Sequence, residues 1–115
     1  VKTKEQVYPL HLLPKGVETF IATEDGSVGK KGLVTDFITA MAAKADQVFA
    51  CGPVAMYKAM HRLKVNKLIQ VSLEAWMGCG MGACYACTTL TRQGPKQVCH
   101  DGPVFELDDI LWNNI

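Results

Sequence analysis

The sequence predicts an α/β fold: a partial, Rossmann-like parallel sheet with flanking helices, followed by a small cysteine-rich loop and a β-hairpin. Three observations support this prediction. Between residues 17 and 72, short β-branched and aromatic runs alternate with amphipathic segments, an order typical of parallel strands joined by helices. Four of the five cysteines lie within residues 79–99, interspersed with glycines. Between the third and the fourth of these cysteines, two short runs flank the turn residues 92–95, as in a hairpin.

Length and charge exclude several classes of protein. A chain of 115 residues is long enough for one small core. Its 12 Lys and Arg residues balance 11 Asp and Glu residues, so there is no excess of basic residues to bind nucleic acid. The apolar runs are far shorter than the roughly 20 residues of a membrane-spanning helix, and no signal peptide is recognisable. We therefore expect a soluble, cytoplasmic protein with neither nucleic acid nor membrane as a partner.

The first predicted strand covers residues 17–22, a β-branched and aromatic run that the polar cluster 24–27 ends. A helix is predicted next, because apolar residues recur at one helical face between Val34 and Ala45. Residues 47–51 predict a second strand. The pair Gly52-Pro53 follows it directly, and since proline favours the first position of a helix, the second helix is expected to begin there. Its inner face is expected to carry Met56, Met60 and Leu63, and residues 68–72 predict the third strand.

Two of the predicted strand ends could contact a ligand. In open α/β sheets, ligands lie beyond the carboxyl ends of strands, where helix N-termini offer free N–H groups. The candidates are Asp25, Gly26 and Ser27 at one corner and Cys51, Gly52 and Pro53 at the other. The alternative is that the first is a surface turn and the second only a helix start. A complete G-x-G-x-x-G fingerprint is absent, so the residues alone do not establish nucleotide binding.

The cysteines carry the strongest chemical signal. Cys79, Cys84, Cys87 and Cys99 have the spacing C-x4-C-x2-C-x11-C, and its first three members match the opening of plant-type [2Fe–2S] proteins. The small residues between them allow a loop to curl around a cluster with its N–H groups pointing inward. Cys51 stands apart, as a buried thiol or as a neighbour of a cofactor.

Other interpretations of these cysteines remain open. Four thiolates also suit tetrahedral zinc, although zinc ribbons normally pair two C-x2-C motifs and this sequence has one. Disulfides are the weaker alternative in a chain without a secretion signal. His100, beside Cys99, is a less favoured candidate ligand. The acidic, apolar tail after residue 103 either packs on the domain or contacts a partner.

The chain resembles the electron-transfer subunits of class B dihydroorotate dehydrogenase over about residues 17–107. Five segments carry the resemblance: Thr23–Gly29 (TEDGSVG), Cys51–Pro53 (CGP), Val71–Glu74 (VSLE), Met77–Cys87 (MGCGMGACYAC) and Val98–Phe105 (VCHDGPVF). The wider group is similar to ferredoxin–NADP reductases. Two departures are evident: the flavin-binding barrel and first glycine-rich turn have no counterpart, and Ala75-Trp76 stands where family members often carry Glu-Arg.

The resemblance implies a function and a division of the chain. Residues 1–74 would be the C-terminal part of a pyridine-nucleotide domain, and residues 75–115 a [2Fe–2S] region with a tail. The four clustered cysteines match the family's cluster ligands, Cys51–Pro53 a motif near the nicotinamide, and Asp25–Ser27 a loop on the nucleotide side. Electrons would pass from NAD, in its reduced form, through FAD, bound mainly by an N-terminal domain missing here, and the cluster to FMN in a catalytic dihydroorotate dehydrogenase subunit of pyrimidine biosynthesis.

Two other functions are kept beside this one. The first is a zinc-stabilised interaction domain without redox activity. The second is a related reductase subunit that serves a hydrogenase, a sulfide-reducing system or a transhydrogenase. By the resemblance, this chain is expected to be a C-terminal fragment that is catalytically incomplete alone.

Overall fold

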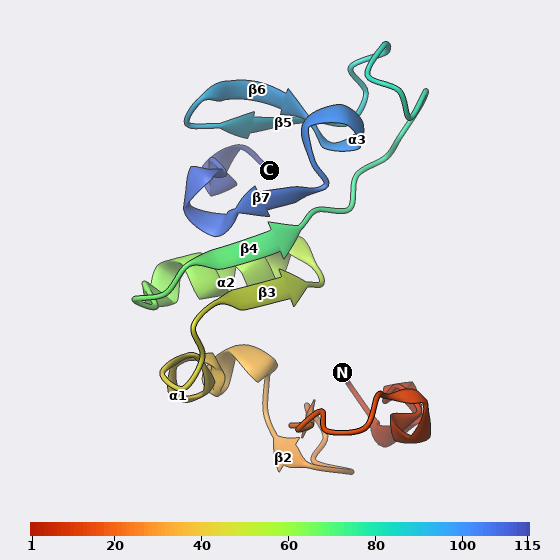
Figure 1. The fold of residues 1–115 in the computed structure, drawn as a ribbon, viewed down its shortest axis with the longest axis vertical. Helices are drawn as coiled ribbons and strands as arrows, with labels where there is room; N and C mark the ends of the chain where they lie inside the picture. Colours follow the sequence, from red (N-terminus) through yellow and green to blue (C-terminus); the bar gives the residue numbers. More distant parts are fainter. The chain divides into compact units, whose positions relative to one another are not determined.

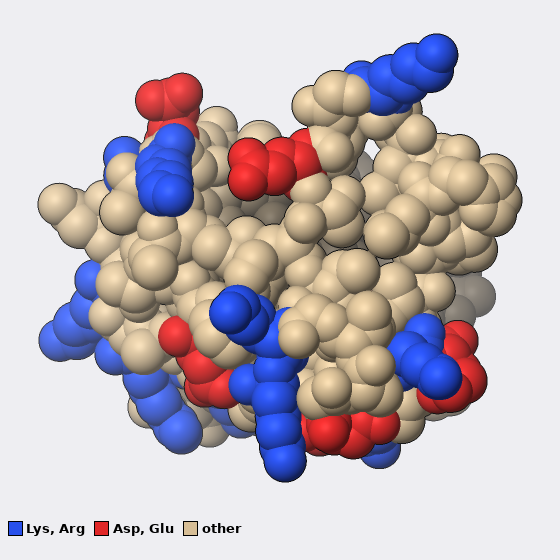
Figure 2. Space-filling model, turned by 90° about the horizontal axis from the view of Figure 1, so that it is seen from below, with Lys and Arg blue, Asp and Glu red and all other residues tan.

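A computed structural model describes residues 1–115, which form two compact units, Val1–Thr39 and Ala40–Ile115. Each unit is described by itself below (Figure 1). No helix combines the length and apolar character needed to cross a bilayer. The space-filling view intersperses basic and acidic side chains over the face shown, with no patch of one sign (Figure 2).

The N-terminal unit is built from short elements. Two 3-10 turns, Lys4–Gln6 and Leu10–Leu12, precede the strands β1 (Ala22–Thr23) and β2 (Lys30–Lys31), which pair in parallel. The prediction of a strand over residues 17–22 is therefore wrong except at Ala22. Val17 and Phe20 are exposed, and since β1 has only β2 as its neighbour in the sheet, no strand covers this apolar run.

The predicted helix over residues 34–45 is shorter than its apolar pattern. A 3-10 turn, Val34–Asp36, leads into α1 (Ile38–Ala42). The carboxylate of Asp36 accepts a hydrogen bond from the Leu33 N–H at 2.8 Å, which caps the turn. Beyond α1 the backbone tightens, because the Lys44 and Ala45 N–H groups bond to carbonyls three residues back. The periodicity thus marks one face of two successive short elements.

After the last residues of α1, the C-terminal unit continues with a strand, a helix and a strand, as predicted. These are β3 (Val48–Cys51), α2 (Val54–Leu63) and β4 (Ile69–Ser72), with β3 and β4 parallel in the register Val48↔Ile69. The helix lies across one face of the two strands (Figure 1). Met60 is buried as expected, but Leu63 is exposed, and the buried aromatic of this helix is Tyr57.

The third strand of this sheet comes from the tail. β7 (Val104–Glu106) pairs antiparallel with β4, so the strand order is β3-β4-β7 and the sheet is mixed. The prediction of three parallel strands is thus wrong for the first of them, residues 17–22, which are not part of this sheet. Leu107, Ile110 and Trp112 are buried, so the tail packs on its own unit. A mixed α/β fold is confirmed, whereas the Rossmann-like arrangement stays a prediction.

The predicted hairpin is present. β5 (Thr88–Thr91) and β6 (Gly94–Gln97) pair antiparallel, and the short helix α3 (Val98–Asp101) follows directly. Gly94 closes the turn with φ +105°, a conformation that glycine adopts without steric cost. The Thr91 hydroxyl donates to the Gly94 carbonyl at 2.7 Å. The hairpin therefore carries the chain from Cys87 back to Cys99.

Candidate metal centre

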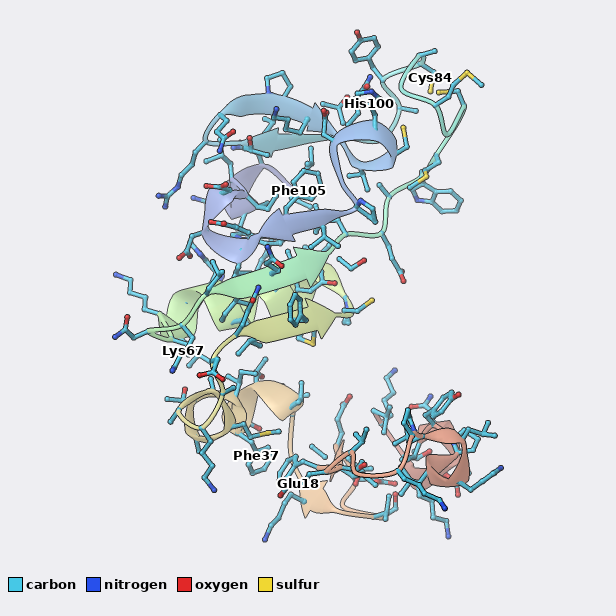
Figure 3. All side chains as sticks on the ribbon, in the orientation of Figure 1. Glu18, Phe37, Lys67, Cys84, His100 and Phe105 are labelled. Carbon is cyan, nitrogen blue, oxygen red and sulfur yellow. The ribbon has the colours of Figure 1, made fainter.

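The four clustered cysteines lie on three neighbouring pieces of the C-terminal unit. Cys79 and Cys84 are in the loop between β4 and β5, Cys87 directly precedes β5, and Cys99 is in α3. The loop that carries Cys84 extends beside α3, the helix of His100 (Figure 3). All four thiols are free; Cys87 is buried, Cys79 and Cys99 are half-buried, and Cys84 is exposed.

Glycines give the cysteine loop its curvature. Gly80 and Gly82 have φ of +70° and +84°, in the left-handed region that other residues rarely adopt. Gly78 has a different reason to be small: a Cβ there would lie 3.0 Å from the Cys84 Sγ. The predicted role of these glycines in curling the loop is consistent with this conformation.

Backbone N–H groups point at the Cys79 sulfur. Met81 and Ala83 donate to the Cys79 Sγ at 3.4 and 3.2 Å. The Met81 N–H, together with those of Cys84 and Ala83 and the Cys84 side chain, lowers the pKa of the Cys79 thiol to about 6. Donors that favour a thiolate also favour a thiolate ligand.

Cys87 and Cys99 form a second pair. The Cys99 N–H donates to the Cys87 Sγ at 3.4 Å, and the Val98 N–H bonds to the Cys87 carbonyl at 3.1 Å. The N–H of Cys99 lowers the pKa of the Cys87 thiol, while the hydrogen bond between the two thiols raises the pKa of Cys99. Thiolate character is therefore favoured at Cys87.

The structure does not bring the four cysteines together into one metal-binding group. No three His, Cys, Asp or Glu side chains are arranged to hold a metal ion. The donor set nonetheless fits an iron–sulfur cluster: four free thiols on adjacent segments, with N–H groups directed at two of the sulfurs. His100 instead lies 3.3 Å from the Asp101 carboxylate.

The first candidate nucleotide corner is an ordered turn in the N-terminal unit. The Ser27 N–H and hydroxyl donate to the Asp25 Oδ1 at 2.9 and 2.6 Å, and the Ser27 hydroxyl accepts from the Lys4 N–H at 2.8 Å. The Ser27 hydroxyl, followed by its N–H, lowers the pKa of Asp25. Gly26 has φ +76°. The Asp25 carboxylate, the Ser27 hydroxyl and the Lys4 N–H are thus hydrogen-bonded within this turn.

The second corner, Cys51–Pro53, belongs to the C-terminal unit. Cys51 ends β3 and is exposed, so the first of its two interpretations, a buried thiol, is wrong, and a place beside a cofactor stays a prediction. Pro53 is the N-cap residue of α2, one residue before its predicted place within the helix. The Gly52 N–H donates to the Tyr57 hydroxyl at 2.8 Å, and that hydroxyl donates to the Ser72 carbonyl at 2.7 Å. Tyr57 therefore links this corner to the end of β4.

Two residues that position these sites escaped sequence reasoning. Tyr57 looks like any aromatic residue on an amphipathic helix, and Gln97 like any polar residue in a hairpin. Their roles depend on hydrogen bonds to residues distant in the sequence: Tyr57 to Ser72, and Gln97 to Gly82. The only available signal is that Gln97 stands two residues before Cys99.

The segment that contains the cysteine loop is apolar and carries no charged residue. The sequence has no Asp, Glu, Lys or Arg between Glu74 and Arg92. Five large side chains of this stretch are exposed: Trp76 (95%), Met77, Met81 and Tyr85 around the cysteines, and Leu90 in β5. Exposed apolar groups gathered in one segment are typical of a binding surface.

The cysteine region has a counterpart among known protein families. Residues 74–111, which include all four cysteines, match the family described as the iron–sulfur cluster binding domain of dihydroorotate dehydrogenase B. These residues belong to that family. The resemblance expected from the motifs is thereby confirmed.

Similarity to curated relatives extends over nearly the whole chain. The electron transfer subunit of dihydroorotate dehydrogenase B (NAD(+)) from Geobacillus sp. is 43% identical over 113 residues, which are 96% of this chain and 44% of that protein. The same subunit from Caldanaerobacter subterraneus is 44% identical over 101 residues, 83% of this chain and 41% of that protein. The chain thus spans less than half the length of these relatives.

A solved structure supports the same relationship. The structure of an NADH-dependent reduced ferredoxin-NADP oxidoreductase, studied for flavin-based electron bifurcation, superposes with a TM-score of 0.70 at 31% identity. It covers 83% of this chain, and the matched part is 36% of that chain. The relatives are therefore components of oxidoreductase systems.

Proposed function

We propose that this chain is the cluster-carrying module of a dihydroorotate dehydrogenase B electron transfer subunit. It relays electrons between NADH and FAD on one side and the FMN of a catalytic subunit on the other, within pyrimidine biosynthesis. The observation that carries the proposal is that the family match at residues 74–111 contains four free cysteines with C-x4-C-x2-C-x11-C spacing.

The cysteines act as ligands. Cys79, Cys84, Cys87 and Cys99 hold a [2Fe–2S] cluster, which when bound accepts and releases one electron at a time. The N–H groups of Met81, Ala83 and Cys99 donate to two of the sulfurs and so offset their negative charge. These residues perform no acid–base chemistry, and the chain supplies position, burial and hydrogen bonds.

The remaining sites serve the nucleotide side. In this proposal residues 1–74 are part of a pyridine-nucleotide domain and residues 75–115 form the cluster region with its tail. Asp25, Gly26 and Ser27 form one NAD contact, and Cys51, Gly52 and Pro53 lie near the nicotinamide. FAD is bound mainly by the portion of the relatives that this chain does not match. The support is the resemblance of TEDGSVG and CGP to the family motifs.

The exposed segment around the cysteines serves as the partner surface. Trp76, Met77, Met81 and Tyr85 expose apolar area within an uncharged stretch. A flavoprotein that covers these side chains brings its cofactor close to the cysteine loop and removes apolar surface from water. The named relatives are electron transfer subunits, which is consistent with a catalytic partner.

Anaerobic reconstitution with iron and sulfide tests the ligand set. We expect a rhombic EPR signal from the reduced protein, lost in Cys84→Ser and retained in Cys51→Ser, which also removes an exposed thiol but outside the set. Protein purified without added metal that contains one zinc per chain, and no EPR signal after reconstitution, would overturn the proposal in favour of a zinc-stabilised domain.

A second candidate differs only in the electron acceptor. The NADH-dependent reduced ferredoxin-NADP oxidoreductase structure at 31% identity favours a related reductase. Affinity purification of the natural complex distinguishes the two. Recovery of an FMN-containing dihydroorotate dehydrogenase supports the first function, and recovery of a different redox protein in its place supports the second.

A further inference from the structure

The cysteine loop and the helix that carries Cys99 are joined by one side-chain hydrogen bond. Gln97 donates from its Nε2 to the Gly82 carbonyl at 2.9 Å. Gly82 lies between Cys79 and Cys84 in the sequence, whereas Gln97 precedes α3. The bond therefore connects the segment of the first two candidate ligands to the segment of the fourth.

Gln97 is itself held on its backbone side. It ends β6, where it is the register partner of Thr88, and its N–H donates to the Asp101 carboxylate at 2.7 Å. Its side chain is half-buried and thus reaches Gly82 from a fixed backbone. The hairpin and α3 thus hold the backbone of Gln97, and its carboxamide reaches the loop.

The contact at Gly82 is close as well as polar. A Cβ on Gly82 would lie 3.0 Å from the Gln97 Oε1 and 3.3 Å from the His100 Cβ. The loop backbone therefore touches α3 and the Gln97 amide together. By contrast, a Cβ on the neighbouring Gly80 would meet nothing within 4 Å, so the loop is anchored at Gly82 and open at Gly80.

We propose that Gln97 is a positioning residue that locks the loop of Cys79 and Cys84 against the helix of Cys99. This inference rests on the proposed ligand role of the cysteines. A neutral carboxamide suits the position because it donates a hydrogen bond without placing charge beside thiolates. A carboxylate of the same shape cannot donate when ionised, and a leucine of similar size cannot donate at all.

The test uses the full chain with two substitutions and a matched control. Gln97→Leu removes the donor, and Gln97→Glu removes it while keeping the shape of the side chain. The control is Gln93→Leu in the turn of the same hairpin, because the amide of Gln93 donates to Asp109 and not to the cysteine loop. We expect both Gln97 variants to lose the visible absorption of the reconstituted cluster about 10-fold faster under a chelator, the scale of outer-shell substitutions. Their EPR g values should also shift, and those of Gln93→Leu should not.

Hydrogen exchange of the metal-free protein separates positioning from general stability. Both Gln97 variants should exchange faster at the amides of residues 79–84 than wild type, with unchanged exchange in β3 and β4. If the wild type takes up a cluster and the Gln97 variants show the same cluster lifetime and g values, the positioning role is refuted, while the proposed function is left intact. Uniformly faster exchange throughout the unit would also refute it. Failure of the wild type to take up a cluster would overturn the proposed function itself.

Discussion

The hydroxyl of Tyr57 is predicted to hold the C-terminal unit together at the corner of Cys51–Pro53. It accepts from the Gly52 N–H at 2.8 Å and donates to the Ser72 carbonyl at 2.7 Å. The ring is 1% exposed and packs against Trp112, with ring centroids 5.6 Å apart. Replacement by phenylalanine removes the hydroxyl and keeps this packing, so the substitution isolates the two hydrogen bonds.

The expected loss follows from those two bonds. A typical intramolecular hydrogen bond contributes about 0.5–1.5 kcal/mol net, so Tyr57→Phe should lower the free energy of unfolding by about 1–3 kcal/mol. With a urea dependence of about 1–3 kcal/mol per M, the midpoint should fall by roughly 1 M. Stability falls because the Gly52 N–H and the Ser72 carbonyl lose their hydrogen-bond partner.

Tryptophan fluorescence during urea unfolding measures this effect. Both tryptophans belong to the C-terminal unit, and Trp112 is buried beside Tyr57, so its emission reports on the region that is changed. Tyr8→Phe, at an exposed tyrosine, is the control and should leave the midpoint unchanged. Equal midpoints for Tyr57→Phe and Tyr8→Phe would show that the bridge does not stabilise the unit.

Three further predictions concern pH and backbone conformation. Burial raises the pKa of Tyr57, so its stabilising contribution is complete below the ordinary tyrosine pKa of about 10 and is lost as pH rises through the folded pKa; the alkaline decline in the urea midpoint should be shallower in Tyr57→Phe, and equal slopes would contradict this. Ser27→Ala should raise the pKa of Asp25 towards its usual range, because the Ser27 hydroxyl lowers it; carboxyl NMR titration measures the shift, and Ser27→Thr should retain the low value. Gly29→Ala should speed amide exchange at Lys30 far more than Gly16→Ala, because both glycines have positive φ but only at Gly29 would a Cβ collide with the Ile21 carbonyl; equal effects would exclude the collision as the cause.

Local pattern was a sufficient guide in the middle of the chain and an insufficient one at its start. The alternation that predicted β3, α2 and β4 is accompanied by burial of Tyr57 and Met60 in α2 and of Val71 in β4, whereas no residue of β3 is buried. Residues 17–22 have an equally strand-like composition but only the two-residue β2 as a sheet partner for β1. Composition describes what a segment can pair with, whereas a strand requires that the pairing partner be present.

In the candidate site, too, local features could be predicted from the sequence and contacts between distant residues could not. The four cysteines proposed as ligands, and the glycines between them, stand out by their spacing, because they lie within 21 consecutive residues. The N–H donors to Cys79 come from residues two and four positions later, so they too are local. The residues that support the site are not: Gln97 reaches back 15 positions to Gly82, and Tyr57 forward 15 positions to Ser72.

The sequence by itself determined the helix and strands around residues 48–72, the hairpin and the cysteine set, since each depends on side chains close together in the chain. The tertiary structure alone decided that β7 joins β4 antiparallel, that the tail packs on its own unit, and that Gln97 and Tyr57 tie loop to helix and strand to strand. The physical reason is that a buried hydrogen bond or a strand pair acquires its stabilising effect only when two distant segments meet and exclude water. Which segments meet depends on the packing of the whole unit.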